Sequence, residues 1–212
     1  MPSETILLVH GLWMTGLEQA LLKRRLETDY GFNCEMFSYA SVTGHMADHV
    51  RNLRELAQQQ HCQRLHFIGH SLGGVVVYKL LESSNNLLPG RAVLIGSPLQ
   101  GSRAAQVMAG STLGRMAVGD SAIDELVSRQ PRQWDGRRDI GLIAGSDNMG
   151  LGRFISGDLA ENSDGTVLIE ETRLEGAADH IILPVSHTSM LFSPLVAQQI
   201  AVFLRTGRFD HA

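Results

Sequence analysis

The chain has 212 residues, of which 43% are hydrophobic and 19% charged, and its net charge is −4. This length suits one well-buried domain and is short for two, so we expect a single domain over residues 1–212. The absence of a basic stripe and of an acidic tail argues against a nucleic-acid partner and against disorder.

The cysteines and the first residues bear on the compartment and on cofactors. Cys34 and Cys62 are too few and too far apart for a disulfide framework or a zinc site, so we expect two buried thiols in a reducing compartment. The opening MPSE has no basic segment, and the apolar run at 6–9 is too short for a signal peptide or a membrane span. These features predict a cytoplasmic protein with no integral membrane segment, no metal and no organic cofactor.

The amino-terminal part alternates short apolar runs with amphipathic segments. Apolar spacing predicts helices over residues 14–29 and 46–60, and the continuous apolar runs predict strands over 5–9, 32–39 and 65–68. Alternating strands and helices imply a parallel sheet with helices on both faces.

The stretch from Arg64 to Leu80, RLHFIGHSLGGVVVYKL, organises the chain. Its short strand is followed by GHSLGG at residues 69–74 and by an apolar run that continues as a buried helix. A serine on so sharp a strand-to-helix turn has a strained backbone and an exposed hydroxyl, which makes Ser71 the candidate nucleophile. The motif alone is weak, because Gly/Ser-rich turns between a strand and a helix are common in α/β proteins.

The turn HGLW at residues 10–13 follows the first strand. In an enzyme with a serine elbow, such a turn aims a backbone N–H at the place where an oxyanion forms. We therefore expect the N–H groups of Leu12 and Leu72 to form the oxyanion hole. His10 is expected to hydrogen-bond the loop backbone as part of the scaffold, not to act as the base.

Residues 91–96 (RAVLIG) predict the next strand, and the loop SPLQGS at 97–102 follows it. Together with the HG turn and the GHSLGG elbow, this loop resembles the α/β-hydrolase fold, in particular compact lipases and esterases without a large lid. The resemblance covers nearly the whole chain. It implies a minimal, mostly parallel sheet of about six strands with helices on both faces, and a catalytic triad in the chain order Ser, Asp or Glu, His.

The resemblance directs attention to one histidine near the end of the chain. Runs at 139–144 and 180–185 predict two late strands, and 195–204 predict a last helix. His187 lies between the last strand and that helix, where the family places its base. A lone histidine at such a junction is more often a capping residue, but the nucleophile and the fold favour a catalytic role.

Two aspartates compete for the role of the triad acid. Asp164, in NSDGTV at 162–167, resembles the Ser-Asp-Gly-x-Val loop of small lipases, although an Asp-Gly pair is also a common turn. Asp147 directly follows a predicted strand, the position that many family members use. We favour Asp164, because a strand-like segment at 166–169 would hold its carboxylate rigidly. Asp158 and Asp179 are outside candidates.

The substrate class depends on what covers the site. An apolar rim suited to an acyl chain is expected, formed by Trp13, Met14, Leu99 and Met190. Residues 103–135 predict two or three short helices, either a small movable cap or an ordinary crossover connection.

The resemblance implies a serine hydrolase that cleaves carboxylic esters of small molecules or lipids through an acyl-enzyme on Ser71. A thioesterase, an amidase or an acyltransferase would use the same triad, and a catalytically silent binding protein would keep the same fold. A nucleotide-binding protein is disfavoured, because no G-x-G-x-x-G or Walker pattern follows the first strand. The sequence leaves the oligomeric state open.

Overall fold

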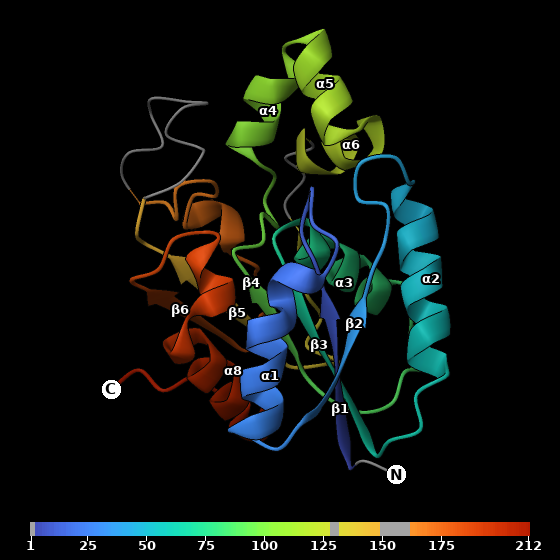
Figure 1. Ribbon diagram of the computed structural model, residues 1–212, viewed down its shortest axis with the longest axis vertical. Helices are drawn as coiled ribbons and strands as arrows, with labels where there is room; N and C mark the ends of the chain where they lie inside the picture. The colour runs from blue at the N-terminus through green and yellow to red at the C-terminus, as the bar shows by residue number, and fades with distance from the viewer. Residues whose placement is uncertain (1–2, 128–131, 149–161) are drawn as a thin grey trace.

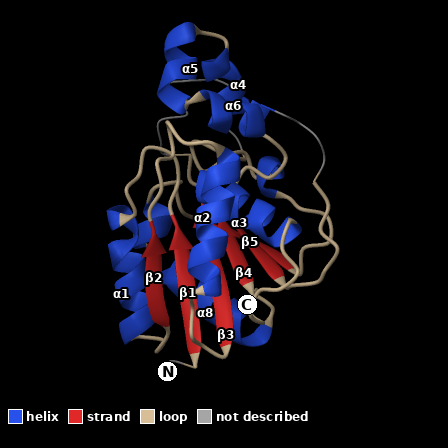
Figure 2. Ribbon diagram, turned by 90° about the vertical axis from the view of Figure 1, so that its right-hand side faces the viewer, coloured by secondary structure: helices blue, strands red, loops and turns tan. Residues whose placement is uncertain are grey.

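The computed structural model describes residues 3–127, 132–148 and 162–212. Six strands form one sheet in the order β2-β1-β3-β4-β5-β6, and every neighbouring pair is parallel (Figures 1 and 2). The expected minimal sheet of about six strands is confirmed. The strands are β1 (Glu4–Val9), β2 (Asn33–Phe37), β3 (Arg64–His70), β4 (Ala92–Ile95), β5 (Ile140–Gly145) and β6 (Asp179–Leu183).

Helices cover both faces of the sheet. Within the described ranges, no helix is long and apolar enough to cross a membrane. One face is covered by the first helix and the last, and the other by the two helices that flank β3 in sequence. The first pair is α1 (Ala20–Thr28) and α8 (Pro194–Thr206), and the second is α2 (Met46–Gln58) and α3 (Leu72–Glu82).

The central strands are apolar on both sides because both sides are covered. In β1, Ile6 and Leu8 belong to the core beneath α1 and α8, whereas Leu7 and Val9 belong to the core beneath α2 and α3. Successive side chains of a strand point to opposite faces, so one continuous apolar run supplies two cores.

Three short helices stand together beyond the carboxyl ends of the strands, at the top of Figure 1. The expectation of two or three short helices over 103–135 is confirmed by α4 (Arg103–Ala109), α5 (Thr112–Val118) and α6 (Asp120–Val127). Ser102 and Ser111 begin α4 and α5, and each hydroxyl accepts a backbone N–H of the first turn. Such capping satisfies donors that have no partner inside the helix.

The segment 14–29 differs from the single helix that its spacing predicts. Gly16, with φ 102°, precedes a short 3₁₀ helix, η1 (Leu17–Gln19), and only then does α1 begin. The glycine turns the chain before α1, so that Leu17 is 72% exposed. Of the expected apolar face, only Leu22 and Leu26 enter the core.

The two thiols also differ from each other. Cys34 is buried on β2, and burial raises the pKa of its thiol to about 12. Cys62 is only half-buried in the loop before β3, so the expectation of two buried thiols is wrong for this residue. Its loop packs against the edge of the core instead of entering it.

Helix α3 lies very close to the ends of β1 and β3. A Cβ at Gly73 would lie 2.3 Å from the carbonyl oxygen of Val9, and a Cβ at Gly69 would lie 2.4 Å from Cα of Gly74. Backbone atoms cannot yield to a side chain as a flexible side chain can, so glycine is required at both positions. The glycines of the elbow therefore hold the start of α3 against the sheet.

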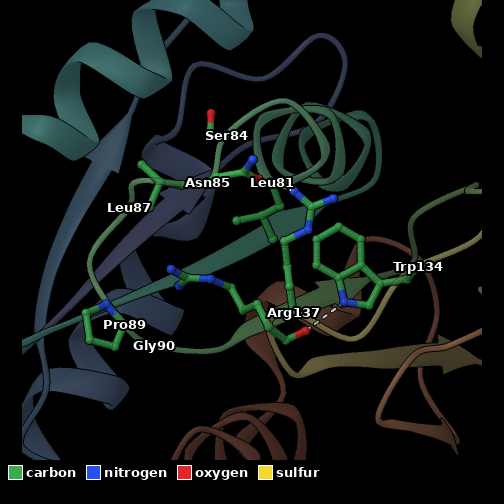
Figure 3. A pocket seen from close by; sticks show the side chains of 9 residues that line it. Leu81, Ser84, Asn85, Leu87, Pro89, Gly90, Trp134 and Arg137 are labelled. Carbon is green, nitrogen blue, oxygen red and sulfur yellow. Dashed lines mark hydrogen bonds between the residues drawn. The ribbon is translucent and has the colours of Figure 1, made fainter.

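A hollow at the opposite, amino-terminal edge of the sheet is lined by Trp134, Arg137 and Arg138 (Figure 3). The Trp134 indole N–H donates to the Arg138 carbonyl oxygen. The Arg138 guanidinium donates to the carbonyl oxygens of Leu65 and Leu88, and burial lowers its pKa to about 10. These bonds fasten the loop between α3 and β4 to the start of β3.

His66 makes the fold sensitive to acid. Its side chain is fully buried in β3, where Nδ1 accepts the Arg91 N–H. Burial, reinforced by the charges of Arg138 and Arg91, lowers the pKa of His66 from 6.5 to about 4. The unfolded chain therefore binds more protons than the folded one between pH 6.5 and 4.

Lowering the pH through this window should destabilise the wild type by about 3 kcal/mol through His66 alone. His66→Asn keeps an acceptor for the Arg91 N–H but does not titrate. The free energy of unfolding, measured with urea at pH 7 and at pH 4, should fall less between these two pH values in the variant than in the wild type. Equal losses in the two proteins would contradict the role of His66.

Candidate active site

Ser71 occupies a strained turn between β3 and α3. Its φ of 55° and ψ of −123° are rare for a residue other than glycine. The Ser71 N–H donates to the Ile95 carbonyl oxygen at 3.0 Å, and the Ser71 carbonyl oxygen accepts the Gly74 N–H at 3.0 Å. The backbone is thus fastened to β4 and to α3, and the half-buried side chain lines a cavity.

His187 is joined to Asp164 by two hydrogen bonds. Its Nδ1 lies 2.7 Å from Asp164 Oδ2, and its backbone N–H donates to the Asp164 carbonyl oxygen at 2.8 Å. Both side chains are buried, Asp164 to 1% exposure. A carboxylate accepts hydrogen bonds, so Nδ1 carries the proton and Nε2 is left as the basic nitrogen.

The carboxylate of Asp164 is held by its own loop. Its Oδ1 accepts the N–H groups of Thr166 at 2.9 Å and Val167 at 2.7 Å. The expected strand at 166–169 is wrong: the segment is a turn with one isolated bridge, from Ser163 to Leu168, and 3₁₀ helix η2 (Glu170–Thr172) follows. Because Gly165 has φ 87°, the chain turns back within two residues and aims both amides at the aspartate.

The competing aspartates lie elsewhere. Asp147 follows β5, where its N–H donates to the Val185 carbonyl oxygen at 3.2 Å, and Asp179 accepts from His211 and from the Phe209 N–H. Asp158 lies outside the described residues. Among the carboxylates that the structure describes, only that of Asp164 forms an ion pair with His187.

Ser71 and His187 line the same cavity. Within the described part of the chain, Ser71 Oγ has no hydrogen-bond partner, and the half-buried side chain belongs to the cavity lining. Hydrogen bonds between a nucleophile and its base are often long in a free enzyme and shorten when substrate binds. The structure thus places Ser71 and His187 in one cavity lining without a hydrogen bond between them.

The two expected oxyanion donors flank the nucleophile. A Cβ at Gly11 would lie only 3.0 Å from Ser71 Cβ, so the turn that carries Leu12 touches the elbow. Leu72 is the first residue of α3, and its N–H therefore has no acceptor inside the helix. The next amide along the turn, that of Trp13, is already bonded to Ser41 Oγ at 3.2 Å.

His10 serves the scaffold, as expected. Its Nδ1–H donates to the Gly11 carbonyl oxygen at 2.8 Å, and its Nε2 accepts the Tyr39 N–H at 3.2 Å. The ring is fully buried and stacked on Tyr39, and burial lowers its pKa. With both nitrogens committed to the backbone, His10 stiffens the turn that presents Leu12.

The cavity has a volume of about 330 Å³ and a largely apolar lining. Of the four residues of the expected apolar rim, Trp13 and Met14 line this cavity. Leu99 and Met190 do not, since both are fully buried in the two cores. The three short helices supply further lining residues, namely Ala104, Ala105, Met108, Val118 and Leu126.

Glu18 is the one acidic residue in the part of the cavity lining that the structure describes. Hydrogen bonds from its own N–H and from those of Thr15 and Gly16 hold the pKa of the Glu18 carboxyl below its usual value. The rim of the cavity therefore carries a negative charge at neutral pH. The part of the chain that the structure describes contains no group of three His, Cys, Asp or Glu side chains suited to a metal ion.

Two glycines that sequence reasoning missed make room for Asp164 and His187. A Cβ at Gly96 would lie 3.1 Å from both Asp164 Oδ2 and His187 Nδ1, and a Cβ at Gly145 would lie 2.7 Å from Asp164 Cβ. Gly96 follows β4 and Gly145 ends β5. In the sequence, each of these glycines follows the last apolar residue of a predicted strand, in RAVLIG and in LIAG, and this position is the signal that could have identified them.

Gly96→Ala should disturb the contact between Asp164 and His187. The new methyl group would lie 3.1 Å from both Asp164 Oδ2 and His187 Nδ1, so these groups must shift, and kcat for a good substrate should drop about 10–100-fold with little change in KM. Gly136→Ala is the matched control, because Gly136 also has a positive φ, 78°, but nothing lies within 4 Å of its Cβ position. Both variants carry backbone strain of about 1–2 kcal/mol, and equal losses of kcat would contradict the steric account.

Comparisons with known proteins identify the family and the fold. The family model described as "Alpha/beta hydrolase family" matches residues 6–201. No curated protein sequence matches the chain.

Solved structures share the fold at low sequence identity. A lipase-esterase related protein from Clostridium acetobutylicum has a TM-score of 0.61 at 14% identity, over 96% of this chain and 94% of that one. The carboxylesterase CesB from Bacillus subtilis has a TM-score of 0.56 at 15% identity, over 97% of this chain and 84% of that one. The type II thioesterase BorB from the borrelidin biosynthetic cluster has a TM-score of 0.58 at 14% identity, over 96% of this chain and 92% of that one.

Proposed function

Because the chain belongs to the alpha/beta hydrolase family, we propose that it hydrolyses carboxylic esters through an acyl-enzyme on Ser71. One observation carries the proposal: His187, 2.7 Å from the buried carboxylate of Asp164, lines the same cavity as the elbow serine. A serine, a histidine and an aspartate in this relation form the minimal apparatus for acyl transfer.

The first half of the reaction acylates the serine. His187 Nε2 removes the proton of Ser71 Oγ as the oxygen attacks the ester carbonyl carbon. The N–H groups of Leu12 and Leu72 stabilise the oxyanion, and Asp164 stabilises the imidazolium. When the intermediate collapses, the C–O bond to the alcohol breaks, and the imidazolium gives its proton to the leaving oxygen.

The second half releases the acid. Water enters, His187 removes a proton from it, and the hydroxyl attacks the acyl-enzyme carbonyl. The oxyanion again lies against Leu12 and Leu72, and the proton returns to Ser71 Oγ as the carboxylic acid departs. No step requires a metal or an organic cofactor.

The lining of the cavity supports neutral esters of small molecules or lipids. Apolar side chains from the three short helices and from Trp13 and Met14 suit an acyl chain. The charge of Glu18 opposes an anionic group at the rim. A cavity of about 330 Å³ favours short and medium acyl chains over long ones.

Fold neighbours include both esterase-related proteins and a thioesterase, so the acyl donor must be tested directly. We expect p-nitrophenyl esters of increasing acyl length to be hydrolysed with an optimum at short or medium length. Ser71→Ala and His187→Ala should each lower kcat by at least about 10³-fold. Asp164→Asn should lower it by about 10³- to 10⁴-fold, because the imidazole then takes the wrong tautomer.

Asp147→Asn is the matched control and should retain activity near that of the wild type. A large loss in Asp147→Asn with none in Asp164→Asn would overturn the assignment of the acid. A higher kcat/KM for the thioester than for the ester of the same acyl group would make thioesterase the better description. The absence of both activities, with Ser71 unreactive, would favour a silent binding protein.

The helices α4 to α6 are proposed to cap the acyl site. Ala104→Phe places a ring in the lining, so the preferred acyl chain should become shorter while kcat for the acetate ester changes little. Val107→Phe, on the exposed side of the same helix and outside the lining, is the control. If the two variants share one chain-length profile, α4 does not border the acyl site.

A further inference from the structure

His70 is a buried histidine that the acyl-transfer steps do not use. It ends β3, directly before the nucleophile, and its side chain has no exposed surface. An apolar residue could fill this buried position at a lower cost in free energy, because a buried polar ring needs hydrogen-bond partners. The contacts of this ring therefore require an explanation.

The first contact is with the base. The His70 Nε2–H donates to the His187 carbonyl oxygen at 3.0 Å, and the centres of the two rings lie 4.7 Å apart. The N–H of His187 is bonded to the Asp164 carbonyl oxygen at 2.8 Å. Both polar groups of the His187 backbone are thus fastened, one by Asp164 and the other by His70.

The second contact is with the oxyanion turn. A Cβ at Gly11 would lie 3.2 Å from His70 Nδ1 and 3.3 Å from the His70 carbonyl oxygen. The ring therefore fills the space between the turn that carries Leu12 and the loop that carries His187. In the described part of the chain, Nδ1 has no hydrogen-bond partner, which is unfavourable because a buried acceptor has lost its hydrogen bonds to water.

The His70 ring is neutral at neutral pH. Burial, and next the charge of His187, lower the pKa of His70 to about 3. The proton of the neutral ring is on Nε2, because the carbonyl oxygen that faces this nitrogen can only accept. A neutral donor at this place holds the loop without opposing the positive charge that His187 takes up during acyl transfer.

We infer that His70 is a positioning residue, whose Nε2–H and ring hold the His187 loop so that the imidazole faces Ser71 in the free enzyme. This inference rests on the proposed function of His187 as the base. It explains why an imidazole with an unpaired nitrogen occupies a fully buried position: the donor to the His187 carbonyl must come from the end of β3. A preorganised base needs no loop movement during turnover.

Two substitutions separate the hydrogen bond from the volume of the ring. The side-chain amide of Gln reaches the position of Nε2, whereas that of Asn reaches only the position of Nδ1. His70→Asn should lower kcat for a p-nitrophenyl ester about 10–100-fold with KM changed less than about twofold. His70→Gln should restore most of kcat.

His66→Asn is the control for loss of a buried imidazole from the same strand, remote from the cavity, and should keep kcat near that of the wild type. Thermal unfolding of all three variants shows how far activity follows stability. Equal kcat in His70→Asn and His70→Gln, whether wild-type-like or reduced, would overturn the inference. A fall in kcat for His66→Asn as large as that for His70→Asn would do the same.

A second measurement does not depend on turnover. The proton on His187 Nδ1, which lies in the 2.7 Å bond to Asp164, should give a low-field NMR signal that Asp164→Asn abolishes. We expect this signal to be sharp in the wild type and in His70→Gln, and broadened or lost in His70→Asn. That pattern in a protein that cleaves no ester would sustain the positioning role and refute the proposed activity. An unchanged signal in His70→Asn would refute the positioning role.

Discussion

The close approach of α3 to the ends of β1 and β3 is the constraint on which the site depends. Glycine is required at positions 69 and 73, because any larger residue would drive its Cβ into backbone atoms, at 2.3 Å in the case of Gly73 and Val9. Within this turn Ser71 has a positive φ of 55°, and the first amide of α3 follows it directly. The close approach also brings the turn at Gly11 against the nucleophile. One packing requirement thus fixes the proposed nucleophile and the proposed oxyanion donors relative to one another.

Asp164 and His187, the proposed acid and base, reach this point from the other half of the sheet. Glycines after β4 and at the end of β5 leave the space that the pair fills, and Asp164 holds His187 by side chain and by backbone. His70 links the two halves of the site, because it ends β3 and its side chain is hydrogen-bonded to the His187 carbonyl oxygen. Each group is therefore fixed by a neighbour that is itself buried, which is what a preorganised site requires.

The sequence could predict what local pattern dictates. The elbow at 69–74, the alternation of strands and helices and the Asp-Gly loop before His187 depend on short-range backbone requirements, and the structure joins Asp164 to His187 as the pattern suggested. It could not predict which way Leu99 and Met190 point, because apolar residues beside a site and apolar residues beneath it look the same in a sequence. The apolar residues at 166–169 look like a strand in the sequence. In the structure, however, the N–H groups of Thr166 and Val167 bond to the Asp164 carboxylate and not to a neighbouring strand.

The most direct test of this account is the crystal structure of the protein after reaction with an alkyl fluorophosphonate ester, a mimic of the tetrahedral intermediate. The account predicts a covalent bond from Ser71 Oγ to phosphorus, with the phosphoryl oxygen about 2.7–3.1 Å from the N–H groups of Leu12 and Leu72. It also predicts His187 Nε2 within hydrogen-bond distance of the Ser71 oxygen and the alkyl group in the apolar cavity. Phosphorus bound to another residue, or a phosphoryl oxygen that points away from both amides, would contradict it.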